Sequence, residues 1–259
     1  MEVKKIKEDL VSFNRWEIAQ KSEREFWDGY TSESLSKELE KMYLKKVEFL
    51  VNQISKYKKL DKNSKILQVG SGPMGIIYYF PTEKKYAIDP LADFYKEKFK
   101  FNYGKVNFKK GVGEEIPSLG KSFDVVILTN VLDHVHLPEK VLSEIRRVLK
   151  DDGIFHFENY VYQKKFIFLA KIWGKLKEIF SGEMFNIHHP YMFTKKRVRI
   201  LLQKNFSILY EELGKDVGDY ENFEELKEFK RNSERLSTKI PALFGIYGTI
   251  NYVAVCKKN

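Results

Sequence analysis

The stretch that decides the fold spans residues 66–75 and reads Ile66-Leu67-Gln68-Val69-Gly70-Ser71-Gly72-Pro73-Met74-Gly75. The apolar residues at its start have the length and type of a strand buried on both faces of a sheet. The glycines have the G-x-G-x-x-G spacing: Gly70 allows a tight turn, Gly72 lets a ligand touch the backbone, and Gly75 lets a helix pack close to the sheet. Pro73 suits a first helical turn, so we expect the loop to open into a helix.

An acidic residue at the end of the next predicted strand strengthens this interpretation. Asp89 lies nineteen residues after Gly70 and closes the strand-like run at residues 85–89. A carboxylate at this point of a βαβ unit binds both hydroxyls of a ribose. A glycine-rich loop alone is often only a turn, but the loop and the acid together predict a ligand site.

Composition places the chain among soluble proteins and leaves several partners open. Its 259 residues are enough for one large core, or one core with a modest lid. The net charge of +10 is compatible with a nucleic acid, an anionic membrane surface or a phosphorylated substrate. Lysines and acids alternate nearly everywhere, which favours solvated helix faces. Cys256 is the single cysteine, which excludes an internal disulfide and a cysteine zinc cluster.

The N-terminal sequence indicates where the protein resides. Residues 1–7 are charged, and no apolar stretch follows them, which is unlike a signal peptide. No run of the sequence reaches the length of a membrane-spanning helix. We therefore expect a cytoplasmic protein.

Periodicity divides the chain into an extension and a main domain. Residues 1–60 predict a helical N-terminal extension that includes an amphipathic helix from about residue 31, and its aromatic residues Trp16, Phe26 and Trp27 suit either the core or a pocket. Residues 61–259 form the second domain, in which strands alternate with amphipathic helices as in a parallel α/β sheet. The run at 123–128 is continuous and β-branched, so it is the central strand.

Two insertions, at residues 160–193 and 214–240, interrupt the rhythm of strands and helices. The first is long for a connection and contains a helical apolar face with Trp173 and Phe180, surrounded by lysines. It suits a lid over a pocket, an interfacial basic helix or extra core. The lid interpretation leads, because ligands bind at the carboxyl ends of such strands, and peripheral membrane contact stays open.

At this point the sequence resembles the class I S-adenosylmethionine-dependent methyltransferases, in the small-molecule branch called type 11. The resemblance covers about residues 60–210 and the last strand. It is carried by Ile66–Gly72, Ala87–Asp89, the long string Phe123–Val135, Pro138–Lys150 and Gly153. A nicotinamide dehydrogenase begins with a similar strand, loop and acid but does not predict the string after residue 123.

The resemblance implies a Rossmann-like, seven-stranded, mostly parallel sheet with an antiparallel last strand, helices on both faces, a helical N-terminal extension and lid insertions. It also implies S-adenosylmethionine as cofactor. The residues implied to bind it are Gly70, Ser71 and Gly72 for the methionine moiety, Asp89 for the ribose, Pro90, Leu91, Gly113 and Glu114 around the adenine, and Thr129 and Asn130 facing the methionine moiety. Gln68 stands where the family usually has an acid, and still accepts a hydrogen bond.

Methyl transfer needs a base only when the acceptor must lose a proton. His134 belongs to the string shared with the family, whereas His188 and His189 lie at the end of the first insertion, where the family builds its substrate pocket. These three histidines are the candidate catalytic residues, and a structural role is open for each. We expect no metal site. Because His189 precedes Pro190, the pair is extended and only one of the two faces the acceptor.

Three functions compete. The leading hypothesis is methylation of a small molecule, on oxygen, with a sugar or a lipid-linked glycan precursor as one form of acceptor. A nucleic-acid (RNA) methyltransferase is suggested by the charge, but Thr129-Asn130-Val131-Leu132 stands where an Asn-Pro-Pro-Tyr type motif would be. A non-catalytic module that binds the cofactor is the third, motivated by Gln68 and by Val112, where the family often has aspartate.

Overall fold

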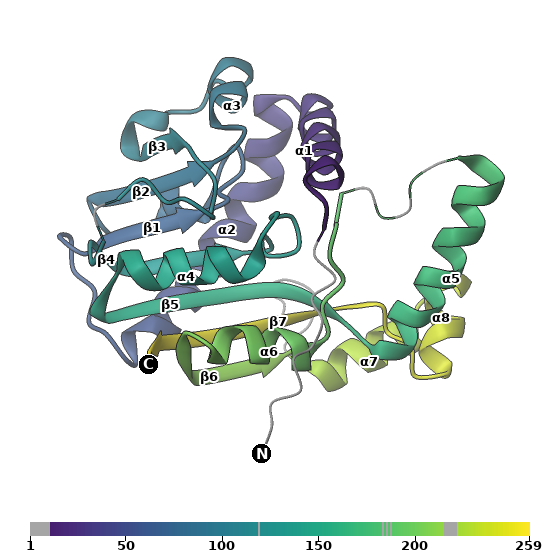
Figure 1. The fold of residues 1–259 in the computed structure, drawn as a ribbon. Coiled ribbons are helices and arrows are strands. Elements are labelled where there is room, and N and C mark those ends of the chain that lie inside the picture. Colours follow the sequence, from purple (N-terminus) through teal and green to yellow (C-terminus); the bar gives the residue numbers. More distant parts are fainter. Residues whose placement is uncertain (1–10, 119, 183, 185, 187, 215–221) are drawn as a thin grey trace.

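The computed structural model describes residues 11–259 except 119, 183, 185, 187 and 215–221. Seven strands form one sheet in the order β3-β2-β1-β4-β5-β7-β6 (Figure 1). The strands are β1 Lys65–Val69, β2 Lys84–Asp89, β3 Asn107–Lys110, β4 Phe123–Thr129, β5 Leu149–Tyr162, β6 Phe206–Leu213 and β7 Thr249–Lys258.

The sheet has the predicted Rossmann-like arrangement. Strands β1 to β5 pair in parallel, and β7 runs antiparallel to both β5 and β6. Consequently the carboxyl ends of β1, β2 and β4 lie along one edge of the sheet, where the predicted binding residues follow them. The mostly parallel sheet with an antiparallel last strand is therefore confirmed.

Helices cover both faces of the sheet (Figure 1). They are α1 Phe13–Asp28, α2 Ser32–Ser55, α3 Ala92–Lys98, α4 Pro138–Val148, α5 Lys164–Ser181, α6 Lys195–Gln203, α7 Phe223–Arg231 and α8 Leu236–Leu243, with two 3-10 helices, η1 Ile76–Tyr79 and η2 Tyr103–Lys105. Helix α2 begins where the sequence predicts, because Thr31 and Ser34 cap its N-terminus reciprocally.

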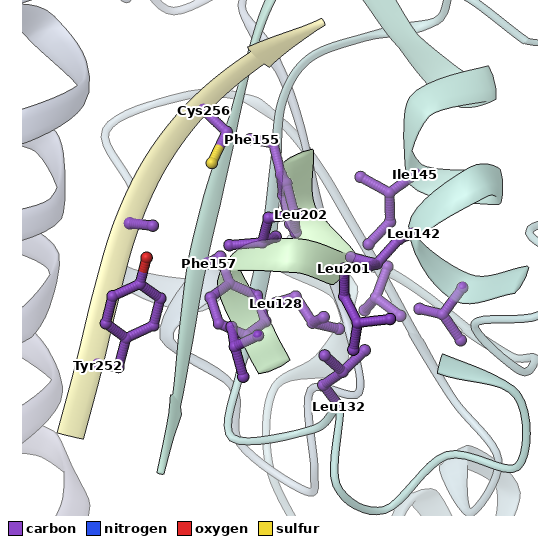
Figure 2. Packing of buried hydrophobic residues seen from close by; sticks show 14 of the residues in the cluster. Leu128, Leu132, Leu142, Ile145, Phe155, Phe157, Leu201, Leu202, Tyr252 and Cys256 are labelled. Carbon is purple, nitrogen blue, oxygen red and sulfur yellow. The ribbon is translucent and has the colours of Figure 1, made fainter. Parts of the chain in front are cut away.

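The core has two layers because side chains along a buried strand alternate between the faces of the sheet. On β4, Val126 and Leu128 pack with α4 and α6, whereas Val125 and Ile127 pack with α2 and η1. Figure 2 shows the first layer, in which leucines of α4 and α6 meet aromatic residues of β5 and β7. The central strand predicted at 123–128 is thus buried on both sides.

The prediction of a helix directly after Gly75 is wrong. Only the short η1 forms there, and Phe80 is already extended, as the following Pro81 requires. The eight residues between Gly75 and β2 leave no room for a regular helix. Helix α2 covers this part of the sheet instead, packing Leu50 and Ile54 in one cluster with Ile76 and Ile77 of η1.

Helix α5 extends outward from the end of β5 (Figure 1). Its apolar face is exposed, with Trp173 at 66% and Phe180 at 84%. The interpretation of this segment as extra core is therefore wrong for α5. Across the part of the chain that the structure describes, every helix is too short or too polar to pass through a lipid bilayer.

Candidate functional site

The glycine loop after β1 is held against the string that follows β4. Gly70 has φ +66° and its N–H donates to the carbonyl of Ile88 at 2.9 Å. A Cβ atom at Gly70 would lie 2.5 Å from Cγ2 of Val131. This position therefore needs glycine twice, for its backbone conformation and for the space occupied by Val131.

Asp89 is buried beside this loop and orients it. Its Oδ2 accepts the N–H of Gly72 and its Oδ1 that of Leu91, both at 2.9 Å. Burial raises the pKa of Asp89 to about 6, although both backbone hydrogen bonds oppose the rise, and the charge of Glu23 adds to it. Each carboxylate oxygen accepts more than one hydrogen bond, so Asp89 retains capacity for ligand hydroxyls.

Gln68 has a structural task besides lining the site. Its Oε1 accepts the N–H of Ile77 at 3.0 Å and so fixes the start of η1. A Cβ atom at Gly75 would lie 2.5 Å from the same oxygen. Gly75 thus makes room for the amide of Gln68, and not for the helix that the sequence predicts.

A cavity of about 330 Å³ occupies this edge of the sheet. Every residue that the resemblance assigns to the cofactor lines it, namely Gln68, Gly70, Ser71, Gly72, Asp89, Pro90, Leu91, Gly113, Glu114, Thr129 and Asn130. Each of these residues follows or ends a strand, or belongs to a loop at the carboxyl edge, as ligands of such sheets require.

Several of these residues already make contacts that sequence reasoning did not predict. Glu114 accepts the backbone N–H groups of His136 and Leu137 at 2.8 and 3.0 Å, which fixes the chain before α4. Asn130 has φ +53°, an uncommon conformation for a residue other than glycine. Such strain is concentrated at functional sites.

The roof of the cavity comes from the N-terminal extension. Trp16, Gln20, Glu23 and Trp27 of α1 line it, and α2 adds Met42, Tyr43 and Lys46. Of the aromatic residues for which the sequence leaves core or pocket open, Trp16 and Trp27 line the pocket. Their spacing with Gln20 and Glu23, at steps of three and four, is the signal that could have identified this face.

A buried ion pair also lines the cavity. Nζ of Lys46 lies 2.7 Å from Oε1 of Glu158, and the same oxygen accepts a hydrogen bond from Asn251 at 3.1 Å. A buried charge needs such partners. Sequence reasoning missed this pair because α2, β5 and β7 meet only in the folded chain.

Asp133, His134 and His189 form a cluster at the cavity. His134 lines the cavity, and its ring centroid lies 4.4 Å from that of His189. Nδ1 of His189 lies 2.7 Å from Oδ2 of the buried Asp133. Burial lowers the pKa of His189, but the hydrogen bond and charge of Asp133, with the charge of Glu23, outweigh it, so that the pKa is raised.

Asp133 stays ionised in this cluster although it is buried. Burial raises its pKa, but the charge of His134 and the hydrogen bond and charge of His189 outweigh this effect, and the pKa is lowered. A buried carboxylate between two imidazoles orients them and stabilises an imidazolium. The cluster can therefore accept and hold a proton beside the cavity.

His188 has a different partner. Its Nδ1 lies 3.1 Å from Oγ of Ser22 on α1, and its ring lies against Phe26, with the centroids 6.2 Å apart. The structure thus brings His134 and His189 together and places His188 against the roof helix. A catalytic role for each histidine stays a prediction.

The same three residues offer one ligand atom each for a metal ion, all within 4.8 Å of one another. Two ligands bound tetrahedrally to zinc at about 2.0–2.1 Å lie about 3.3 Å apart. The 2.7 Å between Nδ1 of His189 and Oδ2 of Asp133 is the distance of a hydrogen bond instead. The geometry therefore favours a hydrogen-bonded network, and the expectation of no metal stays a prediction.

A larger and more open cavity of about 1110 Å³ adjoins the first on the side of Pro90 and Leu91. It extends over Lys110, Ile116 and Arg147 and contains no histidine. It shares only part of its wall with the first cavity and lacks the glycine loop. We therefore place the chemistry in the first cavity.

The insertion at 160–193 contributes little to the cavity. Among its described residues Tyr160 lines the wall, and no residue of α5 does. The lid prediction for this helix consequently gains no support from the structure, and the roof belongs to α1 and α2.

The cavity suits S-adenosylmethionine, the cofactor that the resemblance implies. Oγ1 of Thr129 and Oδ1 of Asn130 are buried in its wall and have no hydrogen-bond partner among the residues that the structure describes. Buried polar atoms are seldom unsatisfied. These two oxygen atoms can therefore accept hydrogen bonds from a ligand donor such as an ammonium group. The glycine loop and Asp89 supply the backbone cradle and the ribose acceptor.

Comparisons with known proteins agree with the family that the sequence resembles. The family model described as "Methyltransferase domain", of type 11, matches residues 67–157. Over 130 aligned residues the chain is 34% identical to the thiol S-methyltransferase TMT1B of Mus musculus. The aligned region covers 47% of this chain and 52% of that protein. The chain thus spans about half the length of the curated relatives that it matches.

Solved structures share the fold at low sequence identity. The proposed sarcosine dimethylglycine methyltransferase of Galdieria sulphuraria superposes with a TM-score of 0.60 and 17% identity, covering 92% of this chain and 97% of that one. The [4+2]-cyclase SpnF superposes with a TM-score of 0.53 and 16% identity, covering 82% of this chain and 81% of that one. These likenesses concern the fold alone. Residues 67–157 therefore match the methyltransferase domain of type 11, and this match, the curated relative and the shared fold together support a class I S-adenosylmethionine-dependent methyltransferase.

Proposed function

We propose that this protein transfers a methyl group from S-adenosylmethionine to an oxygen or sulfur atom of a small molecule, and that His134 removes the proton of the acceptor. The observation that carries the proposal is the cluster of Asp133, His134 and His189 at the cavity that holds the predicted cofactor residues. A hydroxyl or thiol must lose its proton, whereas an unprotonated amine needs no base.

The residues of the chain divide the work. Gly70, Gly72 and Asp89 bind and orient the cofactor, which supplies an already activated methyl group when bound. The roof helix α1 excludes water through Trp16 and Trp27. Asp133 orients His189 and stabilises positive charge on the two imidazoles, so that His134 accepts the proton next to the acceptor.

The chemistry of the wall supports a polar acceptor. Gln20, Glu23 and Lys46 offer hydrogen bonds among the aromatic residues of the roof, as a small-molecule site usually does. A sugar or a lipid-linked glycan precursor methylated on oxygen fits this wall. The similarity to a thiol S-methyltransferase favours a sulfur atom as the methyl acceptor.

A panel of matched acceptors tests the proposal. Pairs of sugars and thiosugars, with an amine and an RNA oligonucleotide as further arms, are incubated with the protein and S-adenosylmethionine, and formation of the demethylated cofactor is measured. We expect turnover with a hydroxyl or a thiol. Turnover of the RNA alone, or cofactor binding without turnover of any acceptor, would contradict it.

Cofactor affinity should depend on pH through Asp89. Because burial raises its pKa to about 6, lowering the pH below this value protonates the carboxyl group and removes an acceptor for the ribose. We expect the Kd for S-adenosylmethionine to rise by up to about tenfold per pH unit below 6. Calorimetric titrations between pH 5 and 8 measure this.

Asp89→Asn is the matched variant for that titration. It keeps the shape of the side chain but removes the proton equilibrium, so its affinity should be weaker and insensitive to pH over the same range. An equal pH dependence in Asp89→Asn would assign the titration to another group.

Cofactor binding should protect α1, and not α5, from hydrogen exchange. Trp16, Glu23 and Trp27 close the cavity from α1, whereas no residue of α5 reaches it. We expect slower exchange in residues 13–28 when S-adenosylmethionine is added, and unchanged exchange in residues 164–181. Protection of α5 without protection of α1 would restore the lid to the first insertion.

A further inference from the structure

Helix α5 carries a continuous exposed apolar surface. Seven of its large apolar residues are between 42% and 84% exposed, and they are Phe168, Leu169, Ile172, Trp173, Leu176, Ile179 and Phe180. Isolated exposed apolar residues are ordinary, but a contiguous set of this size marks a surface that another body covers.

These residues lie on one side of the helix, and lysines border them. At about 100° per residue, the seven fall within an arc of about 140°. Lys171 and Lys175 lie beyond one border of the arc, and Lys177 lies beyond the other. Helix α5 contains five lysines and one glutamate, so the border of the apolar surface is basic.

The apolar arc points away from the body of the protein. Glu178, roughly opposite the centre of the arc, acts electrostatically on Arg15 of α1, whose pKa it raises against the larger lowering by burial. Gly174, which lies opposite the centre of the arc, is the buried residue of α5, so this side of the helix faces the protein. The side with Trp173 and Phe180 is left to face an outside partner.

Helix α8 adds a second apolar surface close to the start of α5. Leu236, Ile240 and Leu243 are exposed by 50% or more and follow one face of the helix. The segment after α8 is bonded to the start of α5, since the N–H of Tyr247 donates to Oε1 of Gln163 at 2.9 Å. Figure 1 shows α8 beside the first turns of α5.

We propose that α5, with α8, docks this protein on the surface of a lipid bilayer that contains anionic lipids. An amphipathic helix with tryptophan, phenylalanine and leucine on one side and lysines at its borders lies in the interface between lipid headgroups and acyl chains. The basic border matches an anionic membrane surface but disfavours a second copy of α5, whose lysines would repel it. This inference rests on α5 and α8 alone and does not depend on the proposed reaction.

Sedimentation of the full chain with vesicles tests the proposal. We expect at least tenfold stronger binding to vesicles of phosphatidylcholine and phosphatidylserine than to phosphatidylcholine alone, and weaker binding as salt screens the lysines. The double variant Trp173→Glu, Phe180→Glu should reduce binding at least tenfold. Leu44→Glu, a single change of the same kind at a residue of α2 that is 51% exposed, should leave it unchanged.

Charge is tested separately. Lys171→Glu with Lys175→Glu should weaken binding to the anionic vesicles, whereas Lys109→Glu, at an exposed position on β3, should weaken it much less. Absence of vesicle binding by the wild-type chain, or equal binding by the double variant Trp173→Glu, Phe180→Glu, would overturn the proposal. So would a dimer, measured by sedimentation without vesicles, that this double variant dissociates.

Discussion

His134→Ala is expected to lower kcat about a hundredfold or more, the usual contribution of a general base. His134 is the histidine that lines the cavity, and Asp133 and His189 lie directly behind it. Its removal takes away the proposed proton acceptor but leaves the glycine loop and Asp89 in place. The Kd for S-adenosylmethionine should therefore stay near the wild-type value, which separates loss of catalysis from loss of binding.

His188→Ala is the matched control for this prediction. His188 contacts Ser22 on α1 and lies outside the cluster with Asp133, so its removal should affect stability more than turnover. Asp133→Asn, a positioning change, should lower the pKa of His189, because it removes the hydrogen bond and the charge by which Asp133 raises that pKa. Wild-type turnover in His134→Ala would show that catalysis rests on placement alone or on His189.

Gly70→Ala should destabilise the protein by about 2–5 kcal/mol and abolish measurable cofactor binding. The left-handed backbone at φ +66° costs a residue with Cβ about 1–2 kcal/mol. The new Cβ would lie 2.5 Å from Val131, and such overpacking costs about 1–3 kcal/mol more. Urea unfolding measures the first effect and calorimetric titration the second.

Gly182→Ala separates the two causes. Gly182 has nearly the same φ, +68°, but a Cβ atom there would meet nothing within 4 Å. We expect it to cost only the backbone contribution of about 1–2 kcal/mol. Val131→Ala in the Gly70→Ala protein should recover part of the lost stability. Equal free energies of unfolding for the two glycine variants would mean that the contact with Val131 is absent in solution.

The sheet and the cofactor edge could be predicted because their signals are local. A strand that ends in Gly70 and Gly72, and a second that ends in Asp89, are visible within a few residues of sequence, and parallel pairing brings their ends together. Local sequence signals could not show that a regular helix is absent after Gly75. Its absence depends on Pro81 and on α2, which covers the space from a distant part of the chain.

The roof and the histidine cluster depend on long-range contacts that no sequence pattern contains. His134 and His189 are separated by fifty-four intervening residues, and only the folded chain brings their rings to 4.4 Å. The sequence indicates both residues as candidates but does not pair either with Asp133. The apolar face of α5 was visible as a pattern, whereas its exposure had to come from the fold.

Helix α1 is attached to the segment that carries the histidines. The carbonyl of Asn186 accepts a hydrogen bond from Arg15 at 2.7 Å, His188 meets Ser22, and the hydroxyl of Tyr191 accepts the N–H of Val11 at 3.1 Å. The helix that covers the cofactor cavity is therefore held to the segment that bears His189. If α1 opens to exchange the cofactor, these hydrogen bonds must break, and the segment that bears His189 then loses its contact with the roof of the cavity.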